Sequence, residues 1–288
     1  MNQPQRNVLT FQWNPAESLG GDVFLTPVYF NRQVLVRYLY DSRFTCDFAS
    51  ETYGTVHGDD FYISFGINAN GSVLAWLGDL QSLPVRECFY WLVENKDPEG
   101  DAKSEFYDAQ VNAKFTEPPA IIRALNALSK LNAGFHKKFG VHLYHERSIE
   151  ERVEETRRYK RLLLNNVDDF KRFVSELNEI INENANNPEL RRLLDAKGVT
   201  TQSGSKGNKL LAAVYDAVLH DKSNLIAPFF CLYDLRLWAD HSMSEDMIKN
   251  VAAKLGGSVD DYQRLLELLI QAINDSSSQL LELVENAA

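Results

Sequence analysis

Apolar and polar positions follow two different periods along the chain, and the change falls near residue 118. Before it, aromatic and β-branched residues form short, partly alternating runs, as in DVFLTPVYF (22–30) and FYISFGI (61–67). Such runs between turn residues are typical of half-buried strands. After it, apolar residues recur every three or four positions, as in AIIRALNALSKL (120–131). The pattern predicts an α+β fold: a small β-rich module over residues 1–118 and an all-helical domain over residues 119–288.

The first module should contain a β-hairpin and two short helices. Asn70-Gly71 lies between two apolar stretches within residues 61–80, and this dipeptide readily takes the positive φ angles of tight hairpin turns. A helix is predicted over residues 84–95, because its opening proline is tolerated in a first turn. Ser104 is expected to cap the second helix.

The boundary between the two parts is predicted at TEPPA (116–120), and the second domain, from residue 119, should hold five to seven helices. Ser148 and Glu151 have the spacing of a capping box before a long charged helix. Asn187 is expected to cap a helix that opens on a proline, and Ser258 with Asp261 to cap the last one. The last four helices are predicted near residues 209–220, 224–241, 244–255 and 259–285.

The composition is that of a globular protein with an acidic balance. Of the 288 residues, 44% are hydrophobic and 24% are charged, and the net charge is −10. An acidic chain gains little from counterion release, which argues against a general binder of nucleic acid but leaves RNA handling at one small site open. No apolar run reaches the ~20 residues of a membrane helix, and the N-terminus has no apolar signal core. We therefore expect a cytoplasmic protein that binds neither membrane nor DNA.

The sequence contains no motif for a cofactor. Cys46, Cys88 and Cys231 stand far apart without paired spacing, so we interpret them as reduced core thiols. GVTTQSGSKGN (198–208) holds glycines and a lysine without the spacing of a P-loop. No flavin or pyridoxal signature is visible either, and the sequence predicts no cofactor.

A histidine-rich segment raises the question of a metal site. His136, His142, His145 and Glu146 gather within residues 135–146, and such side chains could form a metal shell. A glycine interrupts the segment, and the H-E-x-x-H spacing is absent. Local histidine enrichment on a linker explains the same residues, so we predict no metal site.

Residues 76–95 combine aromatic and charged side chains and allow two interpretations. One is a ligand pocket at a strand–helix junction, and the other, which we favour, is an aromatic core beside a turn. The residues concerned are Trp76, Asp79, Arg86, Glu87, Tyr90 and Trp91.

The helix predicted over residues 224–241 is almost continuously apolar, which suits a core or a dimer seam. Arg236 within it needs a carboxylate partner, because an unpaired interior charge is costly. His241 falls where the helix should stop, and the carbonyls there favour a protonated imidazole. At 100° per residue the two positions lie about 140° apart. They would therefore converge only if the helix ends between them or if two chains share the site.

The stretch RLWADH, from Arg236 to His241, resembles the R-x(4–6)-H motif of the HEPN superfamily. Members of that superfamily are all-helical domains, and many are metal-independent ribonucleases of toxin–antitoxin and antiphage defence systems. The resemblance covers the helical half only and implies a composite site across a homodimer. Leu237 follows the arginine where many active members have a polar residue, which leaves room for an inactive, structural member.

Two classes of function follow from these patterns. The first, which the acidic charge favours, is a non-catalytic interaction or scaffold protein with a helical dimerisation or docking domain, working as a homodimer or with a protein partner. The alternative is a HEPN-like metal-independent ribonuclease, with Arg236 as the cation at the phosphate and His241 as acid or base. Under either hypothesis, only the resemblance suggests a prokaryotic stress or defence setting.

Overall fold

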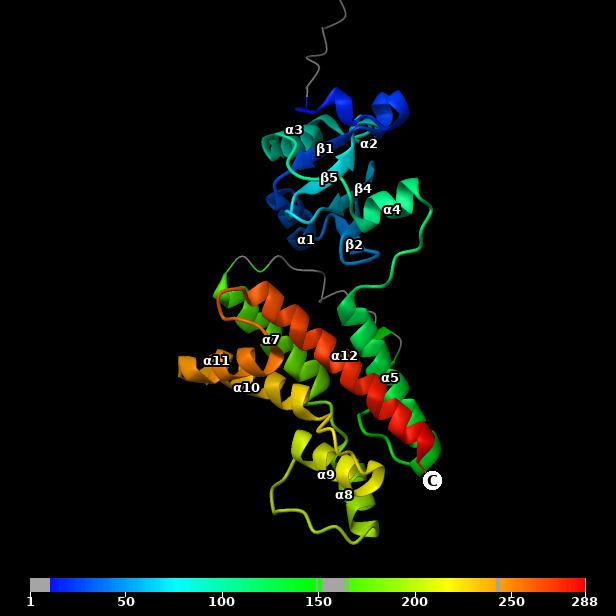
Figure 1. Ribbon diagram of the computed structural model, residues 1–288, viewed down its shortest axis with the longest axis vertical. Coiled ribbons are helices and arrows are strands. Elements are labelled where there is room, and N and C mark those ends of the chain that lie inside the picture. Colours follow the sequence, from blue (N-terminus) through cyan, green and yellow to red (C-terminus); the bar gives the residue numbers. More distant parts are fainter. Residues whose placement is uncertain (1–10, 149, 152–163, 165, 242–243, 288) are drawn as a thin grey trace, which may run out of the picture. The chain divides into compact units, whose positions relative to one another are not determined.

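The computed structural model describes residues 11–148, 150–151, 164, 166–241 and 244–287 (Figure 1). The chain divides into two compact units, Met1–Pro119 and Ala120–Ala288. The first unit holds a sheet with short helices, and the second is helical. The fold is therefore α+β, as the patterning predicts.

The N-terminal unit is built on a six-stranded antiparallel sheet in the order β2-β3-β4-β5-β1-β6. Central strands carry mostly buried residues, as the short apolar runs require. The strands are β1 (Pro27–Phe30), β2 (Thr45–Phe48), β3 (Tyr53–His57), β4 (Tyr62–Ile67), β5 (Val73–Trp76) and β6 (Asn95–Lys96).

The predicted hairpin is confirmed as β4 and β5, although its loop is longer than a two-residue turn. Ile67 pairs with Val73, and Asn68 N–H donates to the Ser72 carbonyl at 3.0 Å. Only Gly71 of the Asn-Gly dipeptide has a positive φ, of 78°. The Asn68 side chain accepts hydrogen bonds from the backbone N–H of residues 70 and 72, and this asparagine-centred network sets the longer loop.

The predicted strand over residues 22–30 is correct only in its second half. Val23–Leu25 form a 3-10 helix, η3, because the Asp22 carboxylate accepts a hydrogen bond from Phe24 N–H at 2.9 Å and bends the chain there. Both predicted helices are present as α3 (Val85–Val93) and α4 (Glu105–Val111), the latter capped by Ser104. The short helices α1 (Val36–Tyr40) and α2 (Leu77–Leu80) were not predicted from the sequence patterns.

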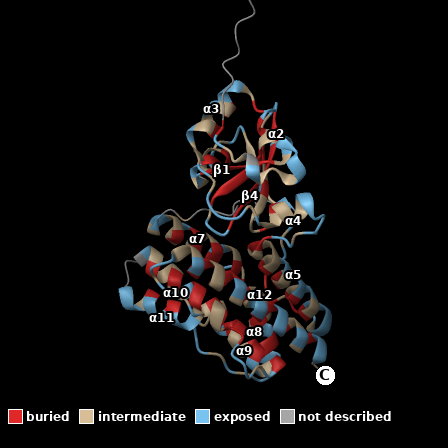
Figure 2. Ribbon diagram, turned by 45° about the horizontal axis from the view of Figure 1, so that its top comes forward, coloured by how far each residue is buried: buried red, intermediate tan, exposed pale blue. Residues whose placement is uncertain are grey.

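Helices form the second unit, and their bounds follow the amphipathic pattern closely. In Figure 1 the last helix lies alongside the first, and both bury their apolar faces in one core (Figure 2). The described helices are α5 (Ala120–Phe139), α7 (Val167–Ile181), α8 (Asn187–Ala196), α9 (Asn208–Leu219), α10 (Ala227–His241), α11 (Glu245–Leu255) and α12 (Tyr262–Asn286).

In the helical unit, the capping chemistry is confirmed at one predicted helix start and corrected at two others. Glu151 N–H donates to Ser148 Oγ at 3.1 Å, and Ser148 N–H donates to Glu151 Oε2 at 2.7 Å, which is a reciprocal capping box. Residues 152–163 of that predicted helix lie outside the described residues. Asn186, not Asn187, caps α8, and Asp261 alone caps α12.

The apolar helix α10 is an interior element of the helical unit. Phe229, Leu232 and Leu235 are fully buried and Trp238 nearly so, and the helix contacts α7, α11 and α12. The structure therefore decides between the two interpretations of its composition in favour of a core. None of the described helices is long and apolar enough to cross a membrane.

Candidate functional site

Arg236 lies in an ion pair along its own helix. Its Nε is 2.9 Å from Asp240 Oδ2, four residues on, and its Nη2 is 3.9 Å from Glu183 Oε1. The side chain keeps 30% of its surface exposed. The carboxylate that a charged residue in an apolar helix requires is thus supplied at the i+4 position, where helix geometry brings side chains together.

Asp240, the closer partner of Arg236, also connects α10 to α7. Asp240 Oδ1 accepts a hydrogen bond from Ser175 Oγ of α7 at 2.8 Å, and Glu183 follows the end of α7. Arg236 is therefore held against α7 at two points. These contacts are the ones that a structural arginine makes.

The second residue of the predicted catalytic pair, His241, is the last residue of α10. The helix runs unbroken from Arg236 to His241, so the two Cα–Cβ directions diverge by about 140° within one chain. The imidazole lies outside the described part of the structure. A common site for both side chains therefore remains a prediction, and it requires a second chain.

The histidine-rich segment brings its residues together in pairs. His136 and His142 stack with ring centroids 3.8 Å apart, and His142 Nε2 lies 3.7 Å from Glu146 Oε1. Among the residues that the structure describes, no group of three or more His, Cys, Asp or Glu side chains is arranged to hold a metal ion.

The aromatic and charged residues of positions 76–95 separate into two places. Glu87 is buried and accepts hydrogen bonds from Arg37 Nη2 at 2.9 Å and Tyr38 OH at 2.7 Å, and Trp91 Nε1 donates to that same hydroxyl at 2.8 Å. Burial, followed by the hydrogen bond to Glu87, raises the pKa of Tyr38 well above its usual range. Trp76 instead packs on Phe106 of α4. Trp76, Glu87 and Trp91 are buried, as the favoured interpretation of a core requires, whereas Arg86 is exposed.

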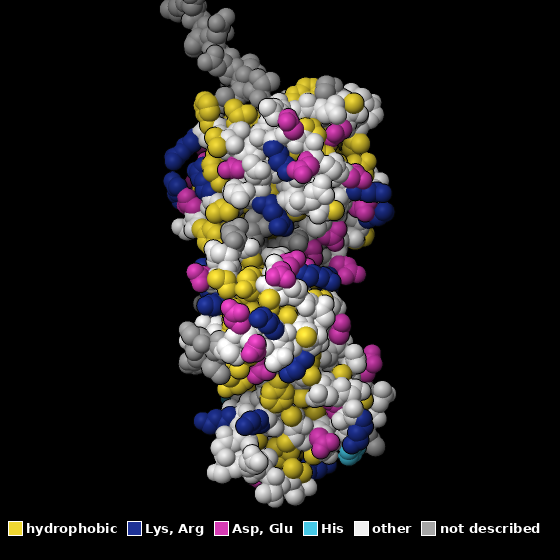
Figure 3. All heavy atoms as spheres, turned by 60° about the vertical axis from the view of Figure 1, so that its left-hand side comes forward, with side chains coloured by type: hydrophobic (Ala, Val, Ile, Leu, Met, Phe, Trp, Pro, Cys, Tyr) yellow, Lys and Arg dark blue, Asp and Glu magenta, His cyan; other side chains and the backbone are white. Residues whose placement is uncertain are grey.

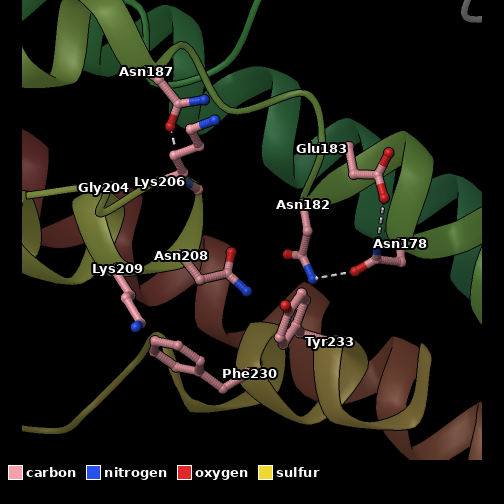
Figure 4. A pocket seen from close by; sticks show the side chains of 11 residues that line it. Asn178, Asn182, Glu183, Asn187, Gly204, Lys206, Asn208, Lys209, Phe230 and Tyr233 are labelled. Atoms are coloured by element: carbon pink, nitrogen blue, oxygen red, sulfur yellow. Dashed lines mark hydrogen bonds between the residues drawn. The ribbon is translucent and has the colours of Figure 1, made fainter. Parts of the chain in front are cut away.

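A pocket of about 430 Å³ opens in the helical unit, and we call it the asparagine pocket (Figure 4). Glu183, which lies near Arg236, is one of its lining residues. Its walls come from the end of α7 and the two residues after it, from the start of α8, from the loop before α9 and the first residues of α9, and from α10. The lining residues are Asn178, Asn182, Glu183, Asn187, Gly204, Lys206, Gly207, Asn208, Lys209, Phe230 and Tyr233.

The loop before α9 is fixed at this pocket by its neighbours. Asn187 Oδ1 accepts a hydrogen bond from Gly207 N–H at 2.7 Å, and the Arg191 guanidinium donates to the Ser205 carbonyl. Gly207 has φ +53° and ψ −125°, a backbone conformation that glycine adopts at low cost. Gly204, Lys206 and Gly207, which do not form a P-loop motif, thus contribute to one wall of the pocket.

Sequence reasoning missed this pocket because its polar residues carry no motif. Asn178 lies in the last turn of α7 and Asn182, four residues on, is the residue directly after the helix. Asn208 lies 26 residues further on. The one available signal was the amide-rich run NENANN at residues 182–187. Comparison with protein-family models, with curated proteins and with solved structures found no match to the chain.

Proposed function

We propose that the protein is a non-catalytic interaction protein that associates with a second copy of itself through α3 of its N-terminal unit. Phe229, Leu232 and Leu235 of α10 face the interior of the helical unit. The dimerisation surface that the sequence assigned to the helical domain is therefore better sought elsewhere.

The observation that carries the proposal is that α3 exposes a row of apolar side chains and buries a glutamate. Val85, Phe89 and Val93 recur every four residues on one face and are 69%, 53% and 78% exposed. The opposite face buries Glu87 and Trp91. A surface helix normally buries its apolar stripe and exposes its charges, and an exposed apolar stripe is typical of an interaction surface.

The orientation of α3 is fixed by its buried face. Glu87 forms an ion pair with Arg37 and a hydrogen bond with Tyr38 inside the unit. Rotating the helix to bury its apolar stripe would expose Trp91 and break that ion pair, and leaving one charge of a buried pair unpaired is strongly destabilising. The stripe therefore stays on the surface.

A second copy is a suitable occupant for such a stripe. Two α3 helices can pack their equivalent valine and phenylalanine side chains across a twofold axis, the commonest symmetry of homodimers. A stable interface needs about 800 Å² per partner, so flanking surface must contribute. Two chains of charge −10 repel each other, and salt should therefore strengthen the association by screening that repulsion.

Sedimentation equilibrium of the whole chain at low and high salt tests the proposal. We expect a monomer–dimer equilibrium that shifts to dimer as salt rises and that Phe89→Lys abolishes. Tyr62→Lys is the matched control, since Tyr62 is 59% exposed on β4, outside the stripe. A chain that stays monomeric at every concentration, or equal effects of both substitutions, would show that α3 is not a self-association surface.

A metal-independent ribonuclease is the second candidate, and the partial exposure of Arg236 favours it. A guanidinium with 30% of its side chain exposed can reach a phosphate. On the face drawn in Figure 3, however, Lys and Arg side chains alternate with Asp and Glu, so any RNA would have to be held locally.

The experiment for this candidate is incubation of the protein with structured RNAs in the presence of a chelator. Cleavage should disappear in both Arg236→Ala and His241→Ala, with the far-UV circular dichroism unchanged, and persist in Lys249→Ala, a surface substitution on α11. Cleavage that survives both of the first two substitutions would exclude the pair as catalytic residues.

A further inference from the structure

The side-chain amides of the asparagine pocket form a hydrogen-bond network, and a carboxylate and a backbone carbonyl fix which atom of each amide donates. Asn178 Nδ2 donates to Glu183 Oε1 at 3.0 Å, and Asn182 Nδ2 donates to Asn178 Oδ1 at 2.8 Å. Asn182 Nδ2 also donates to the Phe229 carbonyl at 3.0 Å, and so does Asn208 Nδ2 at 2.9 Å. A carboxylate and a carbonyl only accept, so the oxygen and nitrogen of each amide are assigned by their partners.

Two acceptor oxygens remain without a partner in this network. Asn182 and Asn208 are 6% and 7% exposed, and the Oδ1 atom of each is buried with no hydrogen bond among the described residues. The two amides share the Phe229 carbonyl, which keeps them close together, and Figure 4 shows both side chains pointing into the pocket. A buried polar atom is normally paired, so the pocket calls for N–H donors.

The remaining lining residues restrict what carries those donors. Lys206 and Lys209 border the pocket, while its one carboxylate, Glu183, is already engaged by Asn178 and by Arg236. This balance favours an anionic ligand over a cationic one. Phe230 and Tyr233 add two aromatic rings (Figure 4), and aromatic rings stack on planar bases.

We infer that the asparagine pocket binds a nucleotide with an exocyclic amino group on its base. The amino group donates its two N–H bonds to Asn182 Oδ1 and Asn208 Oδ1, and the base packs on Phe230 or Tyr233. The phosphate lies near Lys209, a cation that lines the pocket. The volume of about 430 Å³ falls in the range of small-ligand sites.

Titration calorimetry of the whole chain with AMP and IMP tests the base. The two nucleotides differ at C6, where IMP has a carbonyl oxygen in place of the amino group, and at N1, where IMP carries an N–H in place of an acceptor nitrogen. IMP therefore presents one N–H donor at this edge, where the amino group of AMP presents two. We expect AMP to bind at least about tenfold more tightly, because the IMP oxygen would face two acceptors. Equal affinities, or no binding of AMP at millimolar concentration, would overturn the inference.

Two variants test the location of the site. Lys209→Ala should weaken AMP while leaving adenosine unchanged, because only the phosphate loses a contact, and Lys222→Ala, another exposed lysine, is the matched control. Asn208→Ala should remove the preference for AMP over IMP. Thermal unfolding without nucleotide checks that the Asn208 variant is folded, and if it is not, the Lys209 comparison decides alone. AMP binding that is unchanged in both variants would place the nucleotide elsewhere and refute this site.

Discussion

One buried polar cluster in each unit shows a different degree of hydrogen-bond pairing. In the N-terminal unit, Glu87 is buried beneath α3 with Arg37 and Tyr38 as partners. In the helical unit, Asn182 and Asn208 are as deeply buried, but each keeps one oxygen without a partner. A satisfied network holds a fold together, whereas an unsatisfied one lowers stability and is retained where something else binds.

The two units also differ in the apolar side chains that they leave exposed. The N-terminal unit exposes apolar side chains on α3, because the buried glutamate occupies the inner face of that helix. In the described residues of the helical unit, Tyr233 is the large hydrophobic side chain that remains exposed, and it borders the asparagine pocket. The proposed self-association surface therefore lies in the first unit and the proposed ligand pocket in the second.

The largest expected effect is that of removing the buried carboxylate of the N-terminal unit. Glu87→Ala leaves Arg37 without its partner and should lower the free energy of unfolding by roughly 3–5 kcal/mol. Urea unfolding followed by tryptophan fluorescence measures it, since Trp13, Trp76 and Trp91 belong to this unit.

The control for Glu87 is a carboxylate of the same unit in an exposed ion pair. Glu99 contacts Lys96 at the surface, and Glu99→Ala should cost less than about 1 kcal/mol. A similar loss in both variants would mean that the Glu87 network contributes no more than a surface pair, and the contrast between the two units would fail.

Two glycines at close approaches should respond with opposite signs. A Cβ at Gly54 would lie 2.6 Å from the Asp47 carbonyl oxygen, and backbone cannot easily move aside. Gly54→Ala should therefore destabilise the N-terminal unit by about 1–3 kcal/mol. Urea unfolding followed by tryptophan fluorescence measures the change.

The matching glycine of the helical unit is Gly134, inside α5. A Cβ there would meet the end of the flexible Leu281 side chain at 2.7 Å, which can shift, and alanine favours the helix over glycine by roughly 1 kcal/mol. Gly134→Ala should leave the helical unit equally stable or slightly more so, as followed by circular dichroism at 222 nm. A large loss here would show that α5 and α12 are packed too rigidly to adjust.

Arg236→Ala should have a smaller effect than Glu87→Ala. The ion pair with Asp240 is about one-third exposed on both sides, and solvent-exposed pairs contribute about 1 kcal/mol or less. Urea unfolding followed at 222 nm measures it. A loss of several kcal/mol would instead indicate that the contacts of Arg236 with α7 hold the helical unit together.

The smallest effects concern two carboxyl groups whose pKa values shift in opposite directions. Burial raises the pKa of Asp79, while hydrogen bonds from Asn112 and Lys114 lower that of Asp108. Stability from Asp79 is present below its unfolded pKa and is lost as pH rises through the folded value. Stability from Asp108 is present above its unfolded pKa and is lost as pH falls through the folded value.

The melting temperatures of the Asp79→Asn and Asp108→Asn variants test the direction of these two effects on stability. At pH 7, Asp79→Asn should melt slightly higher than the original chain and Asp108→Asn slightly lower, and both differences should shrink in acid. Shifts of the same sign in both variants would contradict the assigned causes.

The patterns that were read correctly are local ones. The hairpin at Gly71 and the capping box of Ser148 and Glu151 depend on residues within a few positions of one another, and α10 and α11 end close to where periodicity places them. Two local features were not predicted: the length of the hairpin loop and the residue that caps α8. Both depend on which of several neighbouring side chains forms a hydrogen bond, and periodicity does not distinguish between them.

The candidate site was predictable only in its residue types. Arg236 could be expected to need a carboxylate, and its partner is Asp240. The contact of Asp240 with Ser175, however, joins two residues that are 65 positions apart in the sequence. The asparagine pocket collects residues from α7, α8, α9 and α10, and no spacing rule connects them.

The sequence by itself determined the α+β class, the apolar runs that became strands and the helical period of the second half, because these depend on the alternation of side chains along a short piece of backbone. Tertiary structure alone decided that α10 is interior, that α3 presents Val85, Phe89 and Val93 outward, and that three asparagines meet. The reason is that burial is a property of the whole packed unit. A side chain lies inside or outside according to what the rest of the chain places against it.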